Sequence, residues 1–177
     1  FAGCRVEKLV YGAVAASVVN DKYGMGYGSI YFQGPFRNAE ITSFSVEENV
    51  SCIPDYLLYE AKAHADELDL NMPVIGAMAF MGENITIDSL TIGEGVEAFS
   101  ESAGSSSSSL FLKQFSEAAI KNLSYHAVNP DVGLDSWDGF YFYGPFYQAA
   151  VTNLTIGEEV VYLDRRMFAG NSFENCE

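Results

Sequence analysis

The chain has 177 residues, of which 49% are hydrophobic and 19% charged, which is enough apolar material for one domain with a sizeable core. Its net charge of −15, from 9 basic and 24 acidic residues, argues against nucleic acids and anionic membrane surfaces as partners. No apolar run approaches the ~18 residues that a membrane-spanning helix needs.

The elements predicted in chain order are β-strands, because a short pattern recurs along the sequence. Each copy has an aromatic or leucine anchor and later a β-branched or small residue followed by two leucine-like residues in the spacing L-x-x-L-x-L. Residues two apart on a strand share one face. The pattern predicts strands over 6–11, 41–46, 65–70, 87–92, 120–125 and 151–156. For the last unit, Phe168 and Phe173 are both possible anchors.

A longer repeat supports these units, and a second signature follows the strands. Residues 31–36 read YFQGPF and return at 141–146 as YFYGPF. Beyond the strands, an apolar V-x-x-[ILF] recurs, for example at Val50 and Ile53, and predicts the inward side of a return path. One strand cannot bury its apolar face alone, so stacking the units in parallel is expected to build a continuous core.

These units resemble the BspA-like leucine-rich repeats of bacterial surface proteins. The resemblance depends on L-T-I-G-E-x-V at 90–96 and 154–160, on VIGAMAF at 74–80 and on FAGC at 1–4, and it covers essentially the whole chain. It implies one domain over 1–177 with about six units. The expected fold class is an α/β repeat solenoid: a right-handed leucine-rich-repeat superhelix, β-rich, with a parallel sheet on one face and short helical or irregular return segments.

The sequence departs from the better-known leucine-rich-repeat consensus in two ways. No asparagine follows the strand at the usual position, which argues against an asparagine ladder. The spacing is also irregular, with insertions near 12–33, 97–113 and 126–143. The chain starts and stops within a unit without a capping sequence, so it is expected to be a fragment of a longer protein.

Two groups of residues are candidates for binding. The first comprises aromatic residues in the insertions, which could stack on a sugar, pack on a protein partner or form an extra packed strand pair: Tyr23, Tyr27, Trp137, Tyr141 and Tyr143. The second comprises outward strand positions, although a solvated sheet face must be polar in any case: Glu67, Asp69, Ser89, Thr91, Asn122, Ser124, Asn153 and Thr155.

The sequence provides no constellation for catalysis. The only histidines, His64 and His126, have no metal-ligand spacing to a partner, and no serine lies in a G-x-S-x-G motif. Asp131, Asp135 and Asp138 miss the ligand spacing of an EF-hand loop. No catalytic residue, cofactor or metal ligand is therefore predicted, and the protein is not expected to be an enzyme.

The resemblance implies a non-catalytic binding or adhesion module of a secreted or cell-surface bacterial protein, with a protein or glycan partner. Two alternatives stay open. The chain could be a structural spacer, or it could be the substrate-targeting repeat region of a larger extracellular enzyme.

Overall fold

The computed structural model describes residues 1–14, 34–100, 113–132 and 143–177, and every regular element within these ranges is a β-strand. The expected strand segments lie in the seven- to nine-residue strands, with few differences at their ends. In chain order the strands are β1 Arg5–Tyr11, β2 Glu40–Val46, β3 Cys52–Ile53, β4 Lys62–Leu70, β5 Val74–Ile75, β6 Ile85–Ile92, β7 Ala98–Phe99, β8 Ala119–Tyr125, β9 Ala150–Ile156 and β10 Asn175–Cys176.

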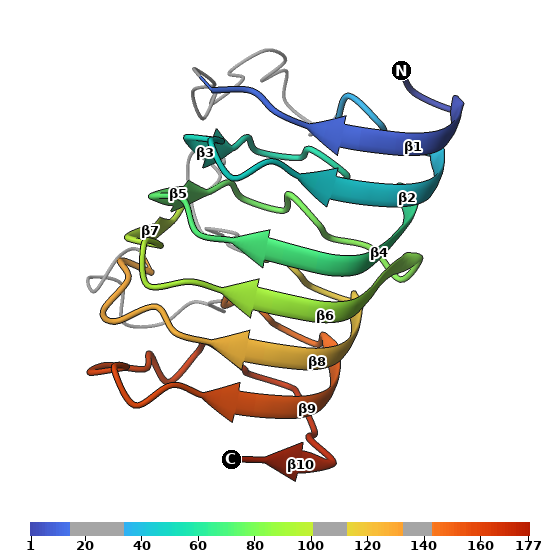
Figure 1. The fold of residues 1–177 in the computed structure, drawn as a ribbon. Coiled ribbons are helices and arrows are strands. Elements are labelled where there is room, and N and C mark those ends of the chain that lie inside the picture. The colour runs from blue at the N-terminus through green and yellow to red at the C-terminus, as the bar shows by residue number, and fades with distance from the viewer. Residues whose placement is uncertain (15–33, 101–112, 133–142) are drawn as a thin grey trace, which may run out of the picture.

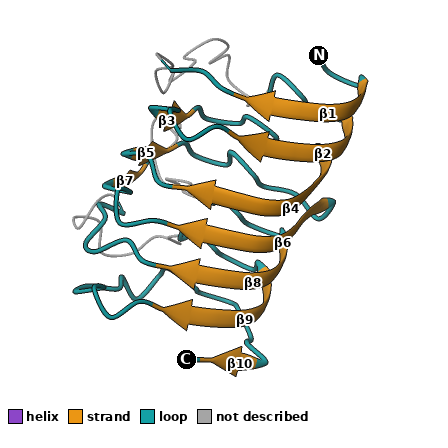
Figure 2. Ribbon diagram, in the orientation of Figure 1, coloured by secondary structure: helices purple, strands orange, loops and turns teal. Residues whose placement is uncertain are grey.

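The strands form two parallel sheets (Figure 1). The larger sheet has seven strands in the order β1-β2-β4-β6-β8-β9-β10, and the smaller has three in the order β3-β5-β7. The small sheet lies beyond the carboxyl ends of the larger strands, where the chain turns away from the large sheet (Figure 2). Because successive long strands are neighbours and parallel, each connection returns the chain to the end of the sheet where the strands begin, as parallel pairing requires.

The register places equivalent apolar residues beside one another across the large sheet. Leu68 pairs with Leu90, Leu90 with Leu123, and Leu123 with Leu154. All four side chains are buried. The recurring L-x-x-L-x-L spacing therefore becomes a set of continuous apolar rows that face the core.

A column of stacked phenylalanine rings runs through the core next to these rows. The ring centroids of Phe80 and Phe115 are 5.1 Å apart, those of Phe115 and Phe146 are 4.8 Å apart, and those of Phe146 and Phe168 are 5.2 Å apart. Phe168 is thus the anchor of the last unit, and Cys176 pairs with Leu154. This settles the alternative that the sequence left open.

The expected fold class, an α/β leucine-rich-repeat solenoid with short helical or irregular return segments, is wrong. The described part of the chain contains strands and turns but no helix. The return signatures form the paired two-residue strands β3, β5 and β7. The turns before the long strands contain residues with positive φ, such as Tyr56 and Glu60 at 59° and 54°. This left-handed conformation interrupts a right-handed helix, so these turns cannot extend into helical segments.

The repeated turn position leads to a stability prediction. Gln148 has a φ of 57°, while Gly82 and Gly170 occupy the equivalent position in other units. Because a side chain at positive φ is strained, replacing exposed Gln148 with glycine is expected to raise the free energy of unfolding by about 0.5–1 kcal/mol. Urea denaturation would measure this gain. Gln148→Ala is the control and should give no gain; equal stability of the two variants would contradict the prediction.

Candidate functional site

One face of the large sheet has no other described segment packed across it, and we call the outward side chains of β4, β6, β8 and β9 the open face (Figure 1). The structure brings the eight outward residues predicted from the sequence together on this face. They form two in-register rows, the first made of Glu67, Ser89, Asn122 and Asn153, and the second of Asp69, Thr91, Ser124 and Thr155. All eight are exposed or half-buried.

An asparagine ladder extends the first row toward the carboxyl terminus. The Asn175 amide nitrogen donates to Oδ1 of Asn153 at 2.7 Å, and the Asn153 amide donates to Oδ1 of Asn122 at 2.8 Å. The Asn122 amide in turn donates to the backbone oxygen of Asp88 at 3.0 Å. These bonds fix the orientation of the three amides. This ladder lies within the strands, so it differs from the asparagine ladder after the strand that the sequence argued against.

The opposite end of the open face carries acidic residues and one histidine. Nδ1 of His64 lies 2.9 Å from the Thr86 hydroxyl, and Nε2 lies 3.1 Å from Oδ1 of Asp66. Asp88 on β6 completes a group in which one ligand atom from each of His64, Asp66 and Asp88 lies within 4.8 Å of the others. Acidic side chains thus gather over β4 and β6, whereas β8 and β9 carry amides and hydroxyls together with the exposed Lys121, which lies in register beside Asp88.

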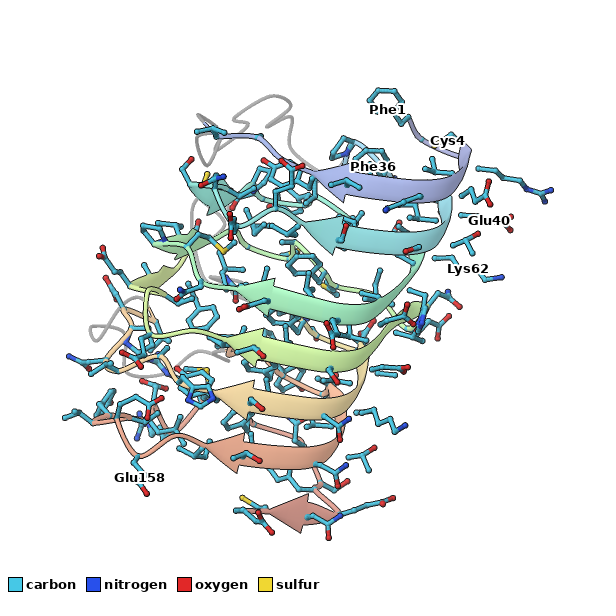
Figure 3. The ribbon with its side chains drawn as sticks, in the orientation of Figure 1. Phe1, Cys4, Phe36, Glu40, Lys62 and Glu158 are labelled. Carbon is cyan, nitrogen blue, oxygen red and sulfur yellow. The ribbon has the colours of Figure 1, made fainter. Side chains whose placement is uncertain are left out.

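The amino ends of the first strands carry charges of both signs. Glu40 of β2 pairs in register with Lys62 of β4, and the two side chains lie at neighbouring strand ends (Figure 3). The Arg5 guanidinium contacts the Glu40 carboxylate at 2.8 Å. Both partners of this contact are well exposed, so it is expected to contribute little to stability.

The aromatic candidates do not extend the open face. Tyr23, Tyr27, Trp137 and Tyr141 lie outside the described residues. Tyr143 is half-buried just before the turn that leads into β9, and its ring packs edge-on against Tyr147 at 4.5 Å between centroids. Lys113 Nζ lies 4.3 Å from the centre of the Tyr143 ring. Tyr143 therefore belongs to a separate cluster at the amino ends of β8 and β9.

The histidine contacts do not assemble a hydrolytic site. The contacts follow the order of a catalytic triad, with Thr86 in the place of the nucleophile, His64 of the base and Asp66 of the acid. Thr86, however, lies within β6, which is paired on both sides. Its neighbouring backbone amides are thus engaged in the sheet and cannot form an oxyanion hole. His126 is half-buried, and its Nδ1 contacts the Glu159 carboxylate.

Two features of the open face were missed by sequence reasoning, although each has a signal. Asn122 and Asn153 occupy the same position in two aligned units, and Asn175 joins them once Phe168 anchors the last unit. His64 and Asp66 are two residues apart on a strand, so they share one face. Asp88 occupies the equivalent position on the next long strand.

Comparison with protein-family models, with curated proteins and with solved structures finds no significant match to this chain. None of the described segments forms a helix that is long and apolar enough to cross a membrane. The chemical interpretation of the open face therefore depends on its own side chains and their geometry.

Proposed function

We propose that the protein is a non-catalytic binding module that holds a protein or glycan partner on its open face. The observation that carries this proposal is the pair of in-register polar rows on a sheet face that no described segment covers. Parallel sheets are usually covered on both faces. An uncovered parallel face with ordered polar rows is a surface suited to recognition.

The spacing of the rows favours a partner with regularly repeated polar groups. Neighbouring strands are about 4.8 Å apart, so each row offers hydrogen-bonding groups at that interval. An extended polypeptide or a chain of sugar units can place donors and acceptors at a matching spacing. The bonds within the asparagine ladder hold Asn122 and Asn153 in place before binding. This preorganisation reduces the entropy lost when a partner is bound.

Charge narrows the class of partner further. Glu67 and Asp69 are exposed on the open face, and the chain as a whole carries a net charge of −15. A protein with a basic patch, or an uncharged glycan, meets this surface without like-charge repulsion. If the partner is basic, raising the salt concentration is expected to slow association, since screening weakens electrostatic steering.

A location at the surface of a bacterial cell is part of this proposal and is supported by the resemblance to BspA-like repeats. Its test is antibody labelling of intact source cells, with permeabilised cells as the control for antibody quality. Labelling of intact cells is the expected result. Labelling that requires permeabilisation would contradict the proposed location.

Arrays of glycans and of extracellular matrix proteins test the binding function directly. The folded chain is expected to give saturable signals on one of the two arrays. A heat-unfolded sample serves as the control for non-specific adsorption and should lose those signals. A folded chain that gives no saturable signal on either array would contradict the proposal and support a spacer role.

A further inference from the structure

The group formed by His64, Asp66 and Asp88 stands out on the open face because it combines an imidazole with two carboxylates. One ligand atom from each side chain lies within 4.8 Å of the other two. His64 is half-buried, whereas both aspartates are exposed. The donors therefore converge at the protein surface, where an ion in solution can reach them.

The sheet register explains why these residues meet. His64 and Asp66 are on β4, and His64 pairs with Thr86 of β6. The pairs on either side of Asp66 place it next to Asp88 of β6. Two carboxylates side by side on neighbouring strands repel each other. A positive charge between them removes this repulsion.

We propose that His64, Asp66 and Asp88 form a binding site for Zn²⁺. Imidazole and carboxylate are both ligands of zinc, with bonds of about 2.0–2.2 Å. Calcium takes oxygen ligands and does not use the imidazole, so the histidine selects for a transition metal. The side chain of Asp66 is 85% exposed, so it is free to rotate toward a bound ion.

The surroundings of His64 fit the role of a metal ligand. The Thr86 hydroxyl lies 2.9 Å from Nδ1 and is itself 3.5 Å from the backbone oxygen of Ala63. If Nδ1–H donates to Thr86 and Thr86 donates to Ala63, the lone pair of Nε2 faces Asp66. In metal sites, the ligating histidine is typically oriented by a hydrogen bond from its other ring nitrogen. A metal ion between Nε2 and the Asp66 carboxylate would accept this lone pair.

The site leaves room for a fourth ligand. Three protein ligands occupy three positions of a tetrahedral zinc ion, and the remaining position is open to water or to a donor from a partner. Zinc binding at His64, Asp66 and Asp88 does not depend on the proposed partner. The failure of one proposal therefore leaves the other standing.

Isothermal titration of the metal-free chain with Zn²⁺ at pH 7.5 tests this inference, with Ca²⁺ titrated in parallel. One Zn²⁺ per chain is expected to bind, and Ca²⁺ is expected to give no comparable binding. His64→Ala and Asp88→Asn should each weaken Zn²⁺ binding by about tenfold or more. His126→Ala is the matched control, because it removes the only other histidine and should leave the affinity unchanged.

Co²⁺ provides a second readout that does not depend on measuring the heat of binding. Its visible absorption is expected to appear on binding to the wild-type chain and to be lost in His64→Ala. Circular dichroism checks that each variant is folded. Asp88→Asn keeps the shape of an exposed side chain, so it serves as the test variant if His64→Ala does not fold. Absence of Zn²⁺ binding, or equal binding by wild type, His64→Ala and Asp88→Asn, would overturn the proposal.

Discussion

Replacing Phe115 with alanine is expected to lower the free energy of unfolding by about 3–5 kcal/mol. The Phe115 ring is fully buried and stacks between Phe80 and Phe146, with centroid distances of 5.1 and 4.8 Å. The substitution removes most of the side chain and leaves a cavity in the middle of the ring column, where both neighbours lose contacts. Urea denaturation followed by circular dichroism would measure the loss.

Phe115→Leu is the matched control for this substitution. In the unit that contains β4, the anchor position is occupied by Leu58, which is buried. Leucine at position 115 is expected to destabilise the chain clearly less than alanine, because it fills more of the space. An alanine variant as stable as wild type would contradict the described core. A leucine variant as unstable as the alanine variant would contradict the explanation by filled volume.

The second large effect concerns Asp55, whose carboxylate is buried near the small sheet. Burial raises the pKa of Asp55 from 3.8 to about 6, against the opposing effect of hydrogen bonds from the Ala77 amide and the Ser100 hydroxyl. Among the described residues, Oδ2 has no hydrogen-bond partner. The folded chain therefore binds a proton more tightly at Asp55 than the unfolded chain does. Between pH 3.8 and about 6, the free energy of unfolding must therefore fall as the pH rises.

Asp55→Asn is expected to remove this contribution. Between pH 4 and pH 7, the stability of the variant relative to wild type should increase by about 2 kcal/mol, which is most of the effect of a pKa difference of about two units. Asparagine keeps an oxygen for the Ala77 amide, and any cost of its new NH₂ group does not vary with pH. Urea denaturation of both proteins across this pH range gives the measurement.

Asp164→Asn is the control with the opposite sign. Hydrogen bonding to Arg166 lowers the pKa of Asp164, so this carboxylate stabilises the folded chain above the unfolded pKa, and the contribution is lost as the pH falls. Relative to wild type, Asp164→Asn should lose stability as the pH rises. A pH-independent difference between wild type and Asp55→Asn would contradict a raised pKa for Asp55.

The sequence predicted the long strands well because their signal is local and repeated. Residues such as Leu90, Leu123 and Leu154 occupy the same position in each unit, and the structure places them side by side. The nature of the return path could not be read in the same way. An apolar V-x-x-[ILF] is compatible with a short helix or a short strand, and the choice depends on pairing between units, as at Val74 and Ala98.

The open face shows a similar division between what could and could not be predicted. Strand alternation was sufficient to place Ser124 and Thr155 outward, because it depends only on residue spacing. The asparagine ladder and the contact between His64 and Asp66 depend on side-chain rotamers and on the register between strands. Neither is determined by one unit alone, so both required the assembled sheet.

Whether the open face is the binding surface is tested most directly by a pair of arginine variants on the glycan and matrix-protein arrays. Ser124→Arg with Thr155→Arg places two bulky cations in the second row of the open face. Asn129→Arg with Gln148→Arg adds the same charge at exposed positions outside that face. We expect the first variant to lose the array signals of the wild-type chain and the second to keep them. Retention of the signals by both variants, or equal loss in both, would contradict the assignment of binding to the open face.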